Sequence, residues 1–185
     1  MACDGNMLKL VIGGAASGKS EFAQRLIEED AGGRELVYLA TMEAKDSESL
    51  ARIERHLRLR EGRGYRTLER LKDIGGAAEL VKKGSFVLLE DITNLCANEM
   101  FPDPETVIRD APGLARRITG GIERLCEALG DAGVVAVTGE LFSDGRIYDG
   151  DVRAYLELLS EVNHELAERA GYVAEIVCGL PDRLK

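Results

Sequence analysis

A short glycine-rich segment sets the strongest limit on the fold of this chain. Residues 12–23 read IGGAASGKSEFA, in which Gly13, Gly18, Lys19 and Ser20 match the pattern G-x-x-x-x-G-K-[ST]. The pattern follows an apolar run and opens a predicted helix, which is the context in which it forms a phosphate-binding loop. Backbone N–H groups of such a loop converge on phosphate oxygens, the lysine adds positive charge, and the serine hydroxyl is offered to Mg²⁺. The segment therefore predicts a nucleotide site with Mg²⁺; a glycine-rich turn without a ligand is the alternative.

Short apolar runs alternate with helical stretches along the whole chain. Strands are predicted at residues 8–12, 36–40, 86–89, 134–137 and 173–177, because these runs are rich in Val, Ile and Leu, as strands covered on both faces are. Helices are predicted at residues 18–29, 47–60, 74–82, 92–100, 113–129 and 152–169, and loops at 61–64, 102–104 and 143–150. This alternation indicates an α/β fold, a mostly parallel sheet flanked by helices, in the three-layer RecA-like architecture of P-loop NTPases. We expect one domain at residues 7–185 and a flexible N-terminal tail at residues 1–6.

Two acidic residues follow the third predicted strand. The sequence FVLLED places Glu90 and Asp91 at the end of a buried run. A P-loop needs a carboxylate to organise its metal ion, either directly or through water. Either Glu90 or Asp91 could therefore hold Mg²⁺, and the predicted metal ligands are Ser20 and Glu90.

A basic helix with one histidine is the second candidate for chemistry. Residues 51–60 read ARIERHLRLR, and helical spacing predicts that Leu50, Ile53 and Leu57 form the buried stripe, with His56 at its border. Flanking guanidinium groups could align a triphosphate, and a neutral imidazole could attack a phosphorus atom. The alternative is a solvated basic face with an incidental histidine.

The charge of the chain excludes some classes of partner. The formal net charge is −9, which argues against a general binder of nucleic acid or of an anionic membrane. Neither a membrane-spanning apolar run nor a signal-peptide pattern is present in the sequence, so we expect a cytoplasmic protein without membrane insertion. The four cysteines form no C-x-x-C pair, so no zinc site or disulfide framework is indicated.

The order of motifs resembles one known family. The segments GGAASGKS, YLATMEAKD, ARIERHLRLR, YRTLE, LLEDIT, VTGE and VNHELAERAGYVAEIVCGLP resemble the bifunctional adenosylcobinamide kinase/adenosylcobinamide-phosphate guanylyltransferase family of cobalamin biosynthesis. The placement of R-I-x-x-H between the P-loop and the strand that ends in Glu90 is the most specific part of the resemblance. It implies a kinase that phosphorylates adenosylcobinamide with ATP or GTP, followed by transfer of GMP from GTP to the cobinamide phosphate.

The same resemblance implies roles for particular residues. His56 corresponds to the guanylylated nucleophile, Lys19 acts on the transferred phosphoryl group, and the subunits are expected to form a homo-oligomer, a trimer. The implied nucleotide contacts are Gly13, Gly14, Ala15, Ala16, Ser17, Gly18, Lys19, Ser20, Thr41, Met42, Glu43, Leu57, Arg58, Leu59, Arg60, Glu69 and Glu90.

The chain departs from the family pattern after its fourth predicted strand. Family members usually carry T-N-E-V-G there, whereas this chain has Gly139 and Phe142 in place of the Asn and the final Gly. Two alternatives therefore stay open beside the bifunctional enzyme. One is a P-loop kinase for another small hydroxyl compound, without guanylyltransferase activity, and the other is a nucleotide-binding regulatory paralogue.

Overall fold

The computed structural model describes residues 7–44 and 46–185, so the tail predicted at residues 1–6 lies outside the described residues. The elements in chain order are β1 (Leu8–Gly13), α1 (Lys19–Ala31), β2 (Leu36–Ala40), α2 (Ser47–Arg60), β3 (Tyr65–Glu69), the 3-10 helix η1 (Ile74–Glu79), β4 (Phe86–Glu90), α3 (Ile92–Met100), α4 (Ala111–Leu129), β5 (Val134–Gly139), α5 (Gly150–Arg169), β6 (Tyr172–Val177) and β7 (Leu180–Arg183).

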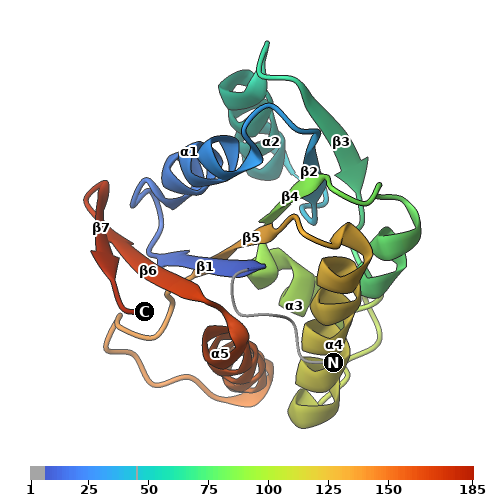
Figure 1. The fold of residues 1–185 in the computed structure, drawn as a ribbon. Helices are drawn as coiled ribbons and strands as arrows, with labels where there is room; N and C mark the ends of the chain where they lie inside the picture. Colours follow the sequence, from blue (N-terminus) through green and yellow to red (C-terminus); the bar gives the residue numbers. More distant parts are fainter. Residues whose placement is uncertain (1–6, 45) are drawn as a thin grey trace.

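These strands form one sheet in the order β3-β2-β4-β5-β1-β6-β7 (Figure 1). All neighbouring strands run parallel except β7, which pairs antiparallel with β6. Helices α1 and α2 lie on one side of the sheet, and α3, α4 and α5 lie on the other (Figure 1). The predicted α/β fold, a mostly parallel sheet flanked by helices, is confirmed.

The central strands β4 and β5 are buried along their whole length because helices cover both faces of the sheet. The core continues into α4, whose Ile118, Ile122 and Leu125 are almost fully buried. Gly121 lets α4 approach η1 closely: a Cβ added there would lie 2.7 Å from a side-chain carbon of Ile74. None of the described helices is both long enough and apolar enough to span a membrane.

Three local predictions need correction. The short helix predicted at residues 74–82 is a 3-10 helix that ends at Glu79, because the adjacent Gly75 and Gly76 disfavour a regular α-helix. The edge strands β3 and β7 were not predicted, since charged residues and Pro181 hide their strand character. The third correction concerns the buried face of α2 and is described with the site below.

Candidate active site

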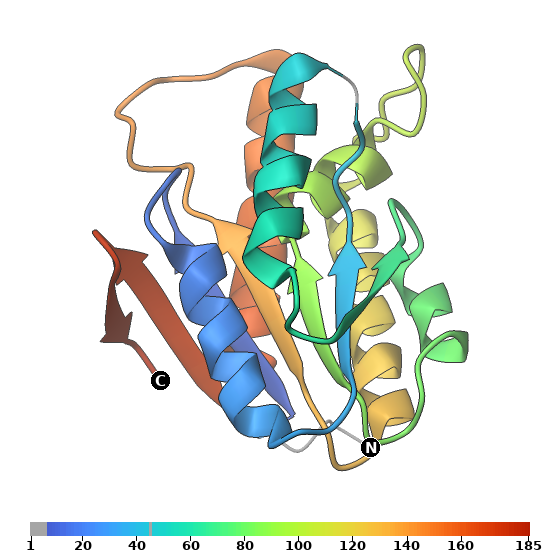
Figure 2. The ribbon, with the colours of Figure 1, turned by 90° about the horizontal axis from the view of Figure 1, so that it is seen from above.

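A cavity of about 420 Å³ opens at the carboxyl ends of the parallel strands, beside the loop between β1 and α1. This edge is where open parallel sheets bind their ligands. Figure 2 shows α2 standing close to that loop, with the segment after β5 on the other side. The residues that line the cavity are Gly13, Ala15, Ala16, Ser17, Gly18, Lys19, Ser20, Glu21, Arg52, Arg55, His56, Leu59, Asp91, Thr93, Gly139 and Leu141.

The phosphate loop is held by close backbone contacts. Gly18 has φ +90°, and a Cβ at this position would lie 3.2 Å from the Cα of Gly179 in the turn between β6 and β7. The N–H of Gly179 donates to the carbonyl oxygen of Ser17 over 2.8 Å. Gly18 therefore meets two demands that a side chain would violate, a left-handed backbone and a near neighbour. The turn that supports the loop was not anticipated from the sequence, because no motif there signals it.

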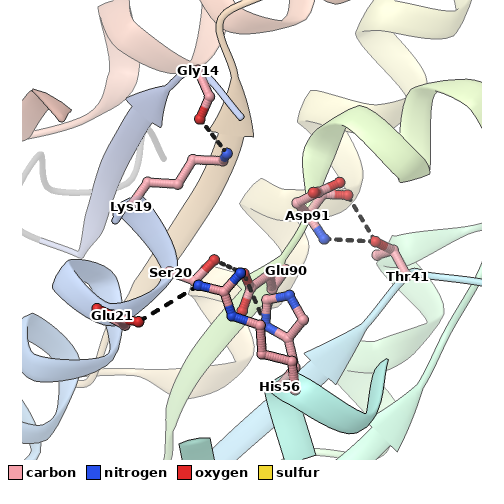
Figure 3. A network of polar contacts seen from close by, with 9 residues as sticks. Gly14, Lys19, Ser20, Glu21, Thr41, His56, Glu90 and Asp91 are labelled. Atoms are coloured by element: carbon pink, nitrogen blue, oxygen red, sulfur yellow. Dashed lines mark hydrogen bonds and ion pairs between the residues drawn. The ribbon is translucent and has the colours of Figure 1, made fainter. Parts of the chain in front are cut away.

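The Lys19 side chain contacts the backbone of the phosphate loop. Its Nζ donates to the carbonyl oxygen of Gly14 over 3.0 Å (Figure 3). Burial lowers the pKa of Lys19, although the nearby carboxylates of Asp91 and Glu90 act in the opposite direction. A poorly solvated ammonium group gains more from an anionic ligand than an exposed one does.

Glu90 joins the phosphate loop to α2. Its carboxylate accepts a hydrogen bond from the Ser20 hydroxyl, and its Oε1 lies 3.4 Å from Nδ1 of His56 (Figure 3). Burial alone would raise the pKa of Glu90, but the hydrogen bond and charge of His56 and the hydroxyl of Ser20 hold it below its usual value. Glu90 therefore stays ionised although only 6% of its surface is exposed.

The donor set around Ser20 fits Mg²⁺. Among the described residues there is no cluster of three or more His, Cys, Asp or Glu that could hold a metal ion. A P-loop does not require one, since Mg²⁺ keeps several waters and takes one or two protein oxygens plus phosphate oxygens. The Ser20 hydroxyl and the Glu90 carboxylate supply such oxygens. In addition, the buried Oγ of Ser17 has no hydrogen-bond partner in the protein, as expected of a hydroxyl that donates to a phosphate oxygen of a bound nucleotide.

Asp91 and Thr41 form a structural unit next to Glu90. The Thr41 hydroxyl donates to the carbonyl oxygen of Asp91 and accepts from its N–H, both over 2.7 Å (Figure 3). The Asp91 side chain caps α3 by accepting from the N–H of Asn94 over 2.7 Å. Burial raises the pKa of the Asp91 carboxyl. These contacts fix the end of β4 and thereby the position of Glu90.

Helix α2 turns its histidine inward. The predicted buried stripe is wrong for Leu50 and Leu57, each 51% exposed, whereas the His56 side chain is only 15% exposed. The reason is that α2 faces the cavity rather than the apolar core, so its inward face carries His56 with Arg52 and Leu59. Asp46 begins the helix by accepting from the N–H of Ser49 over 2.7 Å.

Several predicted contacts lie outside this cavity. Arg60 is buried and its guanidinium stacks 3.2 Å from the ring centroid of Tyr38. Arg58 is exposed and lies 3.8 Å from Glu54 one turn earlier. Of the remaining residues, Met42 is half-buried after β2, Glu43 lines a separate cavity of about 370 Å³, Leu57 faces outward, and Glu69 is exposed at the end of β3.

Other lining residues are not among the predicted nucleotide contacts. Arg52 and Arg55 belong to the basic run that drew attention to α2, and their helical spacing from His56 and Leu59 was the available signal. Thr93 and Gly139 belong to the segments LLEDIT and VTGE of the family resemblance, but neither they nor Leu141 were predicted as contacts. Only the convergence of β4 and β5 at one edge of the sheet brings them to the cavity.

Comparison with known proteins gives one family. The family model described as cobinamide kinase / cobinamide phosphate guanyltransferase matches residues 9–184. The chain is 31% identical to the bifunctional adenosylcobalamin biosynthesis protein CobU of Escherichia coli (strain K12), covering 97% of this chain and 100% of the relative. It is 33% identical to the protein of the same name from Salmonella typhimurium (strain LT2), with the same coverage.

The fold is shared more widely. The flagellar accessory protein FlaH from Methanocaldococcus jannaschii superimposes with a TM-score of 0.53 at 12% identity, over 97% of this chain and 78% of that one. At this identity the likeness concerns the fold alone, which is that of P-loop NTPases.

Proposed function

The chain belongs to the cobinamide kinase / cobinamide phosphate guanyltransferase family, and from this premise we propose that the cavity performs both reactions, with His56 as the guanylylated nucleophile. Family membership makes the chain a transferase of cobalamin biosynthesis with two activities. The substrates are a nucleotide and cobinamide; we propose ATP or GTP for the kinase step and GTP for the second step, with adenosylcobinamide and its phosphate as the acceptors.

The kinase step uses the phosphate loop. The acceptor hydroxyl attacks the γ-phosphorus and releases its proton to water, the bond from that phosphorus to the bridging oxygen breaks, and the nucleoside diphosphate leaves. Lys19 and the backbone N–H groups from Gly13 to Ser20 stabilise the charge on the transferred group. The support is the position of Lys19, whose poorly solvated ammonium group already contacts the loop carbonyl of Gly14.

The guanylyl step uses His56. With its Nδ1 turned toward Glu90, the imidazole presents Nε2 as the nucleophile. Nε2 forms a bond to the α-phosphorus of GTP and pyrophosphate leaves; an oxygen of cobinamide phosphate then attacks the same phosphorus, the N–P bond breaks, and the imidazole is restored. Glu90 fixes the ring orientation and supports the positive charge that develops on the imidazole.

We propose that Ser20 and Glu90 hold Mg²⁺ with the nucleotide. When bound, the ion would neutralise charge on the phosphate oxygens of the substrate.

The observation that carries the proposal is the shared carboxylate. Glu90 contacts both Ser20 of the phosphate loop and His56 of α2, which supports His56 as a nucleophile toward a phosphate bound by that loop. A kinase without guanylyltransferase activity would need no histidine there, and on a solvated basic face the His56 side chain would be more than 15% exposed.

The test is covalent labelling. The protein is incubated with α-labelled GTP and Mg²⁺, denatured, and examined for label in an acid-labile, alkali-stable bond, as a phosphoramidate requires. We expect label in the parent, none in His56→Ala, and full labelling in His164→Ala. His164 is the other histidine of the chain, is 71% exposed and lies on α5. Absence of label from a parent that binds GTP would refute the histidine mechanism and favour the simple kinase.

We also propose that the protein forms a homo-oligomer, a trimer, in the cytoplasm. Its support is the family resemblance together with the exposed Leu50 and Leu57 on the outer face of α2. Light scattering in solution would measure the mass, and a monomer at micromolar concentration would contradict this part.

A further inference from the structure

A second cavity lies beside the first, over the segment between β5 and α5. It has a volume of about 430 Å³ and is called the apolar groove here. Its lining residues are Phe142, Arg146, Ile147, Tyr148, Arg153, Leu156, Glu157 and Ser160. The roles given to the phosphate loop and to α2 leave this groove without a function.

Large apolar side chains are displayed along this segment. Ile147 is fully exposed, Phe142 is 44% exposed, and the neighbouring Leu141 and Val152 are 38% and 50% exposed. Connecting segments are usually polar at their surface, and contiguous exposed apolar patches mark binding sites. The concentration of such residues between Leu141 and Val152 therefore calls for a ligand or a partner.

Polar contacts hold the segment in this shape. The Glu140 carboxylate accepts from the N–H of Phe142 over 2.8 Å and from the hydroxyl of Ser143 over 3.1 Å. Asp144 accepts from the N–H of Arg146 over 2.9 Å and from the Tyr148 hydroxyl. These hydrogen bonds are made by the carboxylates of Glu140 and Asp144, so the exposed apolar side chains of the segment take no part in holding its shape.

The groove borders the nucleotide cavity along the chain. Gly139 and Leu141 line the cavity of the phosphate loop, and Phe142, the next residue, lines the groove. Gly139 is anchored at the cavity by its N–H, which donates to the Thr93 hydroxyl over 2.9 Å. A ligand in the groove can therefore extend one arm along Leu141 to the phosphates.

We propose that the apolar groove binds the corrin ring of the acceptor, an inference that rests on the proposed function. A kinase that acts on cobinamide must hold a large, flat ring with apolar faces and peripheral amides, while one side-chain hydroxyl reaches the γ-phosphate. Phe142, Ile147 and Leu156 offer apolar contact to the ring face, and the guanidinium groups of Arg146 and Arg153 offer hydrogen bonds to amide oxygens. The groove thereby places the ring outside the nucleotide cavity and its hydroxyl arm inside it.

Charge supports the corrinoid as the occupant. The chain is acidic overall, with a net charge of −9, whereas the lining of this groove carries two arginines and one glutamate, with Nε of Arg153 2.8 Å from Oε1 of Glu157. The product of the kinase step carries a phosphate, and this same phosphate is the nucleophile of the guanylyl step. The one positive charge in excess near the arm of the acceptor favours the phosphorylated intermediate, which can therefore stay in the groove for the second step.

The experiment measures corrinoid binding directly. Adenosylcobinamide is dialysed to equilibrium against the full-length protein with Mg²⁺ and a non-hydrolysable ATP analogue, and the bound ring is measured by its visible absorbance. The test variant is Phe142→Ser combined with Ile147→Ser; both side chains are substantially exposed, so the fold is retained. The matched control is Leu80→Ser, which removes a leucine that is 50% exposed at the end of η1.

We expect the Kd for adenosylcobinamide to rise at least tenfold in the double variant, about 1.4 kcal/mol, and to stay within twofold in Leu80→Ser. A corrinoid that lacks the side-chain hydroxyl should compete with adenosylcobinamide for the parent protein and lose this ability in the double variant. Equal affinity in the parent and the double variant would overturn the inference, as would a parent that binds no corrinoid. A double variant with a changed molar mass would also overturn it, since the groove would then be a contact between subunits.

Labelling of the protein by α-labelled GTP, done in the same preparations without corrinoid, separates this inference from the proposed function. If the parent is labelled but the double substitution does not change corrinoid binding, the proposed function is retained and the assignment of the groove is refuted. If the parent binds corrinoid through the groove but takes up no label, the histidine mechanism is refuted instead.

Discussion

Replacement of Thr41 by valine tests whether this residue serves the fold or the nucleotide. Thr41 is fully buried, and its hydroxyl both donates to and accepts from the backbone of Asp91. Valine has nearly the same shape but leaves the N–H of Asp91 without an acceptor; the carbonyl oxygen keeps its bond from Leu95. One lost hydrogen bond of about 1 kcal/mol and one buried unsatisfied donor of about 1–2 kcal/mol give an expected loss of about 2–3 kcal/mol.

Urea unfolding measures this loss, and a thermal scan should show Tm lower by about 4–12 °C for a chain of this size. The control is Thr41→Ser, which keeps the hydroxyl and removes one methyl group, at a cost of about 1 kcal/mol. In both variants the concentration of GTP that half-saturates protein labelling should stay within threefold of the parent. Equal destabilisation by valine and serine would refute the hydrogen-bond argument, and a large loss of GTP affinity in the serine variant would show a direct nucleotide contact.

Three further predictions concern the packing, the cavity and the carboxylate. Gly120→Ala should stabilise the protein by about 0.5–1 kcal/mol, because an added Cβ has no neighbour within 4 Å. Gly121→Ala should destabilise it by about 1–2 kcal/mol, because its Cβ would lie 2.9 Å from a backbone nitrogen of η1; shifts of the same sign in urea unfolding would contradict this. Arg52→Ala should slow single-turnover labelling by GTP at least tenfold, whereas Arg58→Ala, outside the cavity, should stay within twofold; equal effects would exclude a specific role of Arg52. Because the fold lowers the pKa of Glu90, its ionised form adds stability above the ordinary glutamate pKa of about 4.3, and this stability is lost as the pH falls through the lower folded-state value. The stability gap between the parent and Glu90→Gln should therefore be largest at neutral pH and narrow below about pH 4.3, and a gap that is constant with pH would refute this reasoning.

The buried strands were predictable because each is encoded by consecutive apolar residues. The runs in β4 and β5 are apolar at nearly every position, as both faces of the sheet are covered. β3 and β7 lie at the edges, where half of each ladder faces solvent, so charged residues and Pro181 are tolerated and the apolar signal is lost. What the sequence could not show was the use of the turn beside Gly179, whose hydrogen bond to the phosphate loop joins segments far apart in the chain.

The candidate site was predictable where its residues belong to a motif of fixed spacing or end a buried strand. The P-loop lies where its spacing indicated, and Glu90 reaches Ser20 as the end of a neighbouring buried strand should. The placement of Arg60 was not predictable, because a guanidinium in a basic run is equally suited to a phosphate or to a ring. Here it stacks on Tyr38, which is buried in β2.

Helix α2 shows why periodicity alone assigned the wrong face. Hydrophobic spacing assumes that a helix buries leucines against a core, and on that assumption Leu50 and Leu57 point inward. The environment that α2 meets is instead a polar cavity, and His56 also contacts the ionised Glu90, so the side of α2 that carries His56 and Arg52 faces inward. The burial of His56 therefore requires a partner such as Glu90, because a buried imidazole without one would leave a polar nitrogen unsatisfied. Leu50 and Leu57, each 51% exposed, are therefore not part of the hydrophobic core, although their spacing is that of a buried stripe.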